Sequence, residues 1–153
     1  MKKNIKPMIA GMLILITASS CKAKSAQTQQ LTCVSGDSKD KFVQVYHYKG
    51  DELSDITLNL VSDYTKESDE SYKQTLASLK SLAIKQGQIE GVKESIAAEG
   101  KNINQTIKVS MSQYDKENDA LGLFPSSTKD ARAEYLSAEL EKGGFSCDIT
   151  DAG

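Results

Sequence analysis

Short stretches in which apolar and polar residues alternate dominate the chain. Residues 42–48 are β-branched or aromatic almost throughout, and in residues 51–61 Ile and Leu alternate with polar neighbours. Gly50 lies between the two stretches. This pattern predicts a β-hairpin with one buried face. Its turn needs a positive φ at Gly50, which other residues tolerate poorly.

Four more strands are expected elsewhere in the chain. A short apolar patch at 31–34 precedes a cluster of turn-forming residues. Residues 92–98 and 103–111 alternate on either side of the polar sequence EGKN, which indicates a second antiparallel pair joined by a tight turn. Residues 145–149 form the last strand.

Two stretches have the period of an amphipathic helix. The first begins at Ser68, has acidic residues in its first turn and ends near Gly87. The second is expected to begin at Thr128 and to end at a left-handed stop formed by Gly143 and Gly144. The stripe of the first helix contains Tyr72, Leu76, Leu79 and Ala83. In the second helix, Ala131, Tyr135 and Ala138 share a stripe, with Leu136 and Leu140 beside it.

The order of these elements predicts the fold class. Three strands, a helix, two strands, a helix and a last strand (βββαββαβ) indicate an α+β domain. We expect a mostly antiparallel sheet of about five to six strands with two helices packed on one face. Residues 31–150 are long enough for one such domain.

The first twenty residues have the three parts of a secretory signal peptide, which is removed on export. A lysine-rich start precedes an apolar run at 8–16 and small residues at 18–20. The run is too short to cross about 30 Å of hydrocarbon comfortably, which disfavours the alternative of a permanent transmembrane helix. Small residues that lead into Cys21 resemble a lipobox, although Ala18 stands where Leu is usual.

The lipobox resemblance implies that Cys21 carries diacylglycerol and is acylated, for example with palmitate, after cleavage before it. Two or more acyl chains give stable anchoring. Residues 21–30 lack apolar periodicity and are expected to form a flexible tether. The chain is thus expected to be extracytoplasmic and lipid-anchored to the cell membrane or the outer membrane. Ordinary cleavage to a secreted protein is the alternative.

The net charge of the exported part predicts that nucleic acid is not a partner. Without Lys2, Lys3 and Lys6, sixteen basic residues stand against twenty-one acidic ones, which gives a net charge of about −5. Such a surface repels nucleic acid and anionic lipid headgroups. Membrane attachment is therefore expected to come from the lipid at Cys21.

Cys33 and Cys147 are predicted to form a disulfide. They lie on the first and last expected strands, and an exported chain meets an oxidising or thiol-poor compartment. The spacing of the three cysteines does not resemble a metal site. Two free buried thiols are the alternative.

Four short sequences of the chain carry a family resemblance: Leu31–Cys33, Tyr48–Asp51, Ile89–Val92 and Leu140–Cys147. Together they resemble the YehR-like family of small bacterial lipoproteins, which contains a domain of unknown function. The resemblance implies an α+β fold and a lipid anchor, and it brings no catalytic residue, ligand or partner.

His47 is the only histidine, so a histidine-based triad or a multi-histidine metal site is excluded. A structural or surface role is favoured for it. Tyr46 and Tyr48 lie on the same side of their strand and would form a stacking platform if exposed, but packing under a helix is favoured. No catalytic residue or cofactor is expected.

Asp115, Glu117 and Asp119 have the alternating oxygens of a calcium loop. However, Ala120 occupies the position that needs glycine, and Ser126 the position of the bidentate glutamate. An ordinary solvated loop is expected here, and no metal site is predicted.

These observations favour a non-catalytic, membrane-anchored binding or interaction module of the cell envelope. Its partner is an envelope protein or a small ligand. The first alternative is a carrier of a small apolar molecule in a pocket between sheet and helices. The second is an envelope enzyme, which requires polar groups that converge around His47 or a carboxylate.

Overall fold

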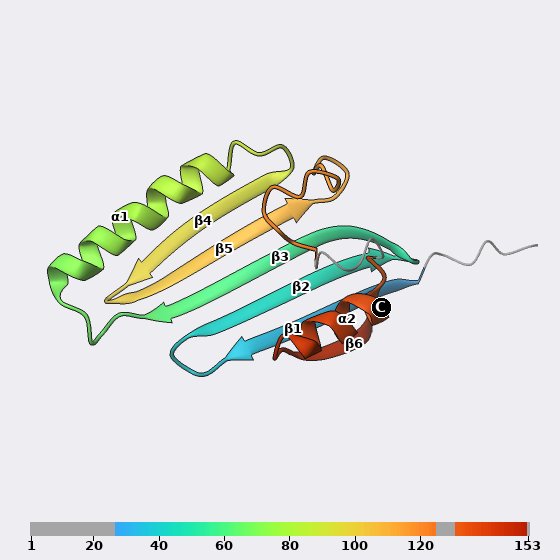
Figure 1. Ribbon diagram of the computed structural model, residues 1–153, viewed down its shortest axis with the longest axis horizontal. Helices are drawn as coiled ribbons and strands as arrows, with labels where there is room; N and C mark the ends of the chain where they lie inside the picture. Colours follow the sequence, from blue (N-terminus) through green and yellow to red (C-terminus); the bar gives the residue numbers. More distant parts are fainter. Residues whose placement is uncertain (1–26, 125–130, 153) are drawn as a thin grey trace, which may run out of the picture.

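The computed structural model describes residues 27–124 and 131–152. Figure 1 shows one sheet with α2 in front of β1 and β6 and with α1 alongside β4 at the other edge. The strands are β1 (Thr28–Gly36), β2 (Lys41–Lys49), β3 (Glu52–Asp63), β4 (Val92–Glu99), β5 (Asn102–Ser110) and β6 (Ser146–Ala152). The helices are α1 (Asp69–Gln86) and α2 (Ala133–Lys142).

The six strands form one antiparallel sheet in the order β4-β5-β3-β2-β1-β6. Helix α1 packs along the edge strand β4, and α2 packs over β6 and β1 at the other edge. The predicted α+β class, strand arrangement and element order are confirmed. Strand β1 begins at Thr28, so the sheet extends into residues that the sequence pattern assigns to the tether.

Successive side chains along each strand point to opposite faces of the sheet. We call the face on which the helices pack the helix face, and the opposite one the open face. On β2, Tyr46 and Tyr48 are buried on the helix face, whereas His47 lies between them on the open face. The turn between β2 and β3 has Gly50 at φ 63°, as the hairpin pattern predicts. The largest fully buried side chains are Tyr46, Tyr48, Leu31, Ile56, Ile103, Leu136, Val109 and Cys33.

Helix α1 begins where the sequence predicts. The Ser68 hydroxyl accepts a hydrogen bond from the Ser71 amide at 3.1 Å, and Gly87 caps the other end. The Lys101 ammonium lies 2.7 Å from an Asp69 carboxylate oxygen and joins the first turn of the helix to the turn between β4 and β5. None of the residues of α1 is fully buried, because the helix covers the edge strand rather than the centre of the sheet.

The expected start of α2 is wrong, and the buried side of the helix is the one beside the stripe that contains Tyr135. Residues 128–130 lie outside the described range, and the helix begins at Ala133 after an extended Arg132. Leu136 is fully buried, whereas Tyr135 is 51% exposed with the Arg132 guanidinium 4.7 Å from its ring centre. Both stripes satisfy the helical period, and the one that contains Leu136 buries more apolar surface against the sheet. Gly144 has φ 90° and forms the left-handed stop.

Cys33 and Cys147 form the predicted disulfide. The two residues are direct partners in the β1–β6 ladder, with Cα atoms 4.1 Å apart. The bond fastens the last strand to the first. Among the residues that the structure describes, no helix combines the length and the apolar character needed to cross a bilayer.

Candidate functional site

A β-bulge interrupts the β2–β3 hairpin. His47 pairs with Asp55 and Tyr48 pairs with Leu53, so Ser54 is the extra residue. The Ser54 hydroxyl donates to the His47 carbonyl at 3.1 Å, and the Ser54 carbonyl accepts from the Met111 amide at 2.9 Å. Bulges redirect neighbouring side chains and are frequent beside functional sites. This one fixes the positions of His47 and Asp55 on the open face.

A depression of about 520 Å³ adjoins the bulge. Polar side chains of the open face line it, from strands β2, β3, β4 and β5: His47, Asp55, Thr57, Lys93, Lys108 and Ser110. We call it the open-face depression. A second hollow of about 290 Å³ shares Asp55 and Ser110 with it and extends toward the β2–β3 turn. Polar groups therefore gather around His47, as the enzyme alternative requires.

The wall of the open-face depression depends on one glycine. Gly91 has φ 80°, and its carbonyl accepts from the Ser110 amide at 2.8 Å. A Cβ atom at this position would lie 2.8 Å from the Ser110 carbonyl oxygen and 2.9 Å from the Tyr114 nitrogen. Gly91 thus allows the start of β4 to pass close to the turn that follows β5.

Lys93 and Lys108 are direct cross-strand partners on the open face. Like charges that lie opposite each other destabilise a sheet, so the pair is unfavourable unless a counter-charge is present. Neither ammonium makes an ion pair with the residues that the structure describes. The His47 side chain likewise makes no hydrogen bond or ion pair within residues 27–124 and 131–152.

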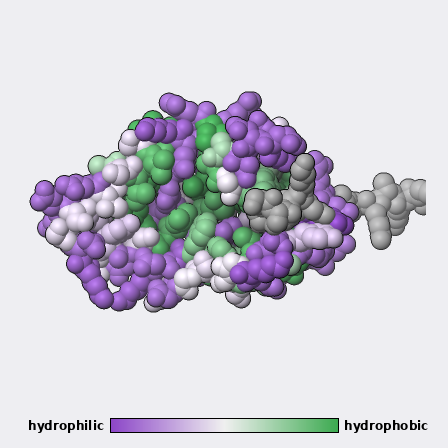
Figure 2. All heavy atoms as spheres, viewed as in Figure 1, coloured by the Kyte–Doolittle hydropathy of each residue, from purple (hydrophilic) through white to green (hydrophobic). Residues whose placement is uncertain are grey.

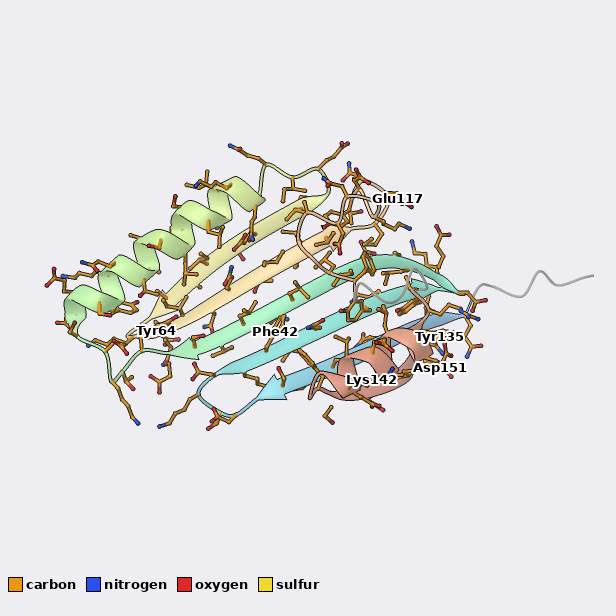
Figure 3. All side chains as sticks on the ribbon, viewed as in Figure 1. Phe42, Tyr64, Glu117, Tyr135, Lys142 and Asp151 are labelled. Atoms are coloured by element: carbon orange, nitrogen blue, oxygen red, sulfur yellow. A yellow bond between two sulfur atoms is a disulfide. The ribbon has the colours of Figure 1, made fainter. Side chains whose placement is uncertain are left out.

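An apolar strip lies on the opposite face, between the two helices. Phe42 pairs with Leu60 across β2 and β3, and Leu58 pairs with Ile107 across β3 and β5. These four residues define the strip. Phe42 and Leu60 are only partly buried, because α1 covers β4 and α2 covers β1 and β6. Figure 2 shows hydrophobic residues gathered between the helices, and Figure 3 shows Phe42 over the middle of the sheet.

The segment between β5 and residue 124 folds around one carboxylate. The oxygens of Asp119 accept from the Tyr114 hydroxyl at 2.9 Å and from the amides of Leu123 and Phe124 at 2.8 and 3.0 Å. Asp115 accepts from the amides of Glu117 and Asn118. These oxygens bind the chain's own donors, and the described residues contain no group of three or more metal-ligating side chains of the His, Cys, Asp and Glu types.

The remaining candidates from the sequence have clear positions. Tyr46 and Tyr48 are 1% and 2% exposed, so they pack in the core and form no stacking platform. The Tyr46 hydroxyl donates to Gln44, and the Tyr48 hydroxyl donates to the Ala131 carbonyl at 2.7 Å. Burial and the nearby Asp119 carboxylate raise the pKa of Tyr46 far above its ordinary value. Cys21 lies outside the described residues.

The sequence reasoning missed the two lysines of the open-face depression. A signal was available, because the predicted tight turn at 99–102 already pairs residue 93 with residue 108. The turn alone does not predict that these lysines line the same depression as His47 and Asp55. This arrangement requires β3 to pair with β5 across the intervening helix, and it requires the bulge at Ser54.

Two solved structures share the fold. The NMR structure of the YehR protein from E. coli matches with a TM-score of 0.61 and 14% identity, over 77% of this chain and 88% of that one. The NMR structure of a protein from Streptococcus pneumoniae TIGR4 matches with a TM-score of 0.50 and 16% identity, over 99% of each chain. At these identities the likeness concerns the fold alone, which is YehR-like. No family model matches the chain. No curated protein matches it either.

Proposed function

We propose that this protein is a lipid-anchored, non-catalytic binding module of the bacterial envelope, and that its apolar strip holds an acyl-like ligand. The observation that carries the proposal is the partial exposure of Phe42 and Leu60 on the part of the sheet that lies between α1 and α2. Apolar surface that stays exposed on a folded domain often marks a binding site.

The chemistry of the strip favours an apolar ligand with a polar end. Its floor is aliphatic and aromatic, and the amide of Gln44 lies beside Leu58 and Cys33 in the same cross-strand row. Gln44 is a buried polar residue whose oxygen already accepts from Tyr46. Its amide nitrogen is the group that would donate to the polar end of a ligand.

The anchor belongs to the same proposal and rests on the sequence before Cys21. A lipobox-like cysteine after a short apolar run supports export and acylation. The YehR-like fold is consistent with the family resemblance, which implies a lipid anchor. An acylated protein would present its apolar strip close to a source of acyl chains.

The geometry around His47 favours binding over catalysis. Nucleophilic catalysis needs a base within hydrogen-bond reach of a nucleophile, with a third group that orients the base. The His47 imidazole makes no such hydrogen bond with the described residues, and no ion pair joins it to Asp55, its cross-strand partner.

Two measurements test the proposal separately. Growth with labelled palmitate should label the wild type and should not label Cys21→Ala. Unlabelled protein, or a processed form that retains residues before Cys21, would contradict the anchor.

For the strip, the full-length protein purified in detergent is titrated with a fluorescent fatty acid. Leu60→Asp should weaken binding about tenfold or more, because it puts a charge on the floor. The matched control Ile84→Asp changes a residue of α1 that is 69% exposed and should leave binding intact. Equal binding by both variants and the wild type would contradict an acyl site on the strip.

A further inference from the structure

We infer that the open-face depression binds an anionic group of the phosphate class between Lys93 and Lys108, with His47 as an additional donor. This site lies on the face opposite to the apolar strip, and it does not depend on the proposed acyl ligand.

Lys93 and Lys108 place two positive charges side by side across the β4–β5 ladder. Directly opposite residues have Cβ atoms about 5 Å apart, a spacing at which one anion contacts both ammonium groups. The described residues supply no carboxylate to either lysine. No ion pair with the described residues offsets the repulsion between the two lysines, and a bound anion would reduce this repulsion.

Strand β3, which pairs with β5, adds a hydrogen-bond donor in the same cross-strand row as the lysines. Thr57 on β3 is the cross-strand partner of Lys108 and contributes a hydroxyl to the depression. Ser110 contributes a second hydroxyl and His47 a ring nitrogen. Hydroxyl, imidazole and ammonium groups around one concave surface match the several acceptor oxygens of a phosphate.

Asp55 is the acidic residue in the lining, and its negative charge makes one side of the depression less favourable for an anion. It lies opposite His47 and opposite Ser110, one row away from the lysines. Its charge repels an anion that approaches the His47 side. Neutralising Asp55 should therefore strengthen anion binding, whereas neutralising the lysines should weaken it.

The strand register places the depression near the end of the sheet at which β1 begins. Thr28 pairs with Lys49, and His47 precedes Lys49 by two residues on β2. Cys21 precedes Thr28 by seven residues, which span at most about 25 Å when extended. If the proposed anchor is correct, a lipid phosphate lies within reach, so the anion is either a lipid headgroup or a free phosphate.

The experiment uses the full-length protein purified in a non-ionic detergent. One arm titrates it with inorganic phosphate and follows the melting temperature and the binding heat. The other arm adds micelles that contain phosphatidylglycerol, with phosphatidylcholine as the lipid without net charge. A phosphate-only response identifies a free ion, and a response confined to phosphatidylglycerol identifies a headgroup.

Three variants determine whether the response arises at this site. The double variant Lys93→Gln/Lys108→Gln should lose binding about tenfold or more, and Asp55→Asn should strengthen it by about twofold or more. The control Lys80→Gln/Lys85→Gln removes two exposed lysines of α1 and should bind as the wild type does.

Folding of the double variant is checked in the absence of anion, where its melting temperature should equal or exceed that of the wild type because the repulsion is gone. Two results would overturn the inference. One is that neither probe binds. The other is that the double variant binds as tightly as the control. Neither result depends on palmitate labelling, so failure of the anchor and failure of the site are distinguishable.

Discussion

Cys33 lies directly opposite Cys147, and their disulfide joins the first strand of the sheet to its last. Strand β6 is an edge strand that pairs only with β1 in the sheet order, and α2 packs on both strands. The bond therefore holds together the part of the domain in which the two ends of the described chain meet.

Reduction of this disulfide should destabilise the domain substantially. The bond closes a loop with a sequence separation of 114, and removal of such a cross-link costs about 2–5 kcal/mol. Urea denaturation of the wild type with and without reductant measures the effect. The variant Cys147→Ser should match the reduced wild type. Coincident curves with and without reductant would contradict a structural role for the bond.

Loss of the Asp119 carboxylate should unfold the segment after β5. One carboxylate satisfies the Tyr114 hydroxyl and the amides of Leu123 and Phe124. Hydrogen bonds to charged groups contribute about 1.5–3 kcal/mol each and are not additive, so we expect Asp119→Ala to cost about 2–4 kcal/mol.

The matched control for Asp119 is Glu117→Gln, an exposed side chain in the same segment, which should cost under about 0.5 kcal/mol. Chemical denaturation gives both values. Hydrogen exchange should locate the loss of protection at residues 121–124. Similar stability of the two variants would show that the Asp119 contacts contribute little.

Gly91 and Gly100 form a matched pair for testing close packing. Both have a positive φ, at 80° and 59°, but a Cβ at Gly91 would lie 2.8 Å from the Ser110 carbonyl oxygen, whereas nothing lies within 4 Å of a Cβ at Gly100. Gly100→Ala should cost about 1 kcal/mol from backbone strain alone. Gly91→Ala should cost at least about 1–3 kcal/mol more, because backbone must shift. Equal melting temperatures would contradict the close approach at Gly91.

Stability should fall at alkaline pH because of two buried tyrosines. Burial, and then the contacts with Asp119, raise the pKa of Tyr114 to about 12 from an ordinary value of 10.0, although the Leu121 amide opposes the shift. Burial raises the pKa of Tyr46 further. The unfolded chain loses these protons first, so the stabilisation is complete below pH 10 and declines as the pH rises toward 12.

Urea midpoints measured at neutral pH and at a pH of about 11 test this prediction. Phenolate absorbance of the native protein should show tyrosines that ionise only on unfolding. A midpoint that stays constant above the ordinary tyrosine pKa, with full phenolate formation in the native state, would contradict it.

Local patterns in the sequence predict the helices, the strands and much of the core. Alternation in residues 51–61 indicated which side of β3 is buried, because the side-chain period of a strand is two. Ser68 and Gly87 marked the ends of α1 because capping is a local property. The pairing of Cys33 with Cys147 followed from export chemistry and strand position.

The places where distant segments meet depend on the assembled sheet. A helical period allows two neighbouring stripes in α2, and contact with β1 and β6 selected Leu136 over Tyr135. The pairing of β3 with β5 joins residues on either side of α1, and the extra residue Ser54 shifts the register beside His47. Such non-local pairing leaves no local periodicity, so the open-face depression and the partly exposed apolar strip emerged only when the sheet was assembled.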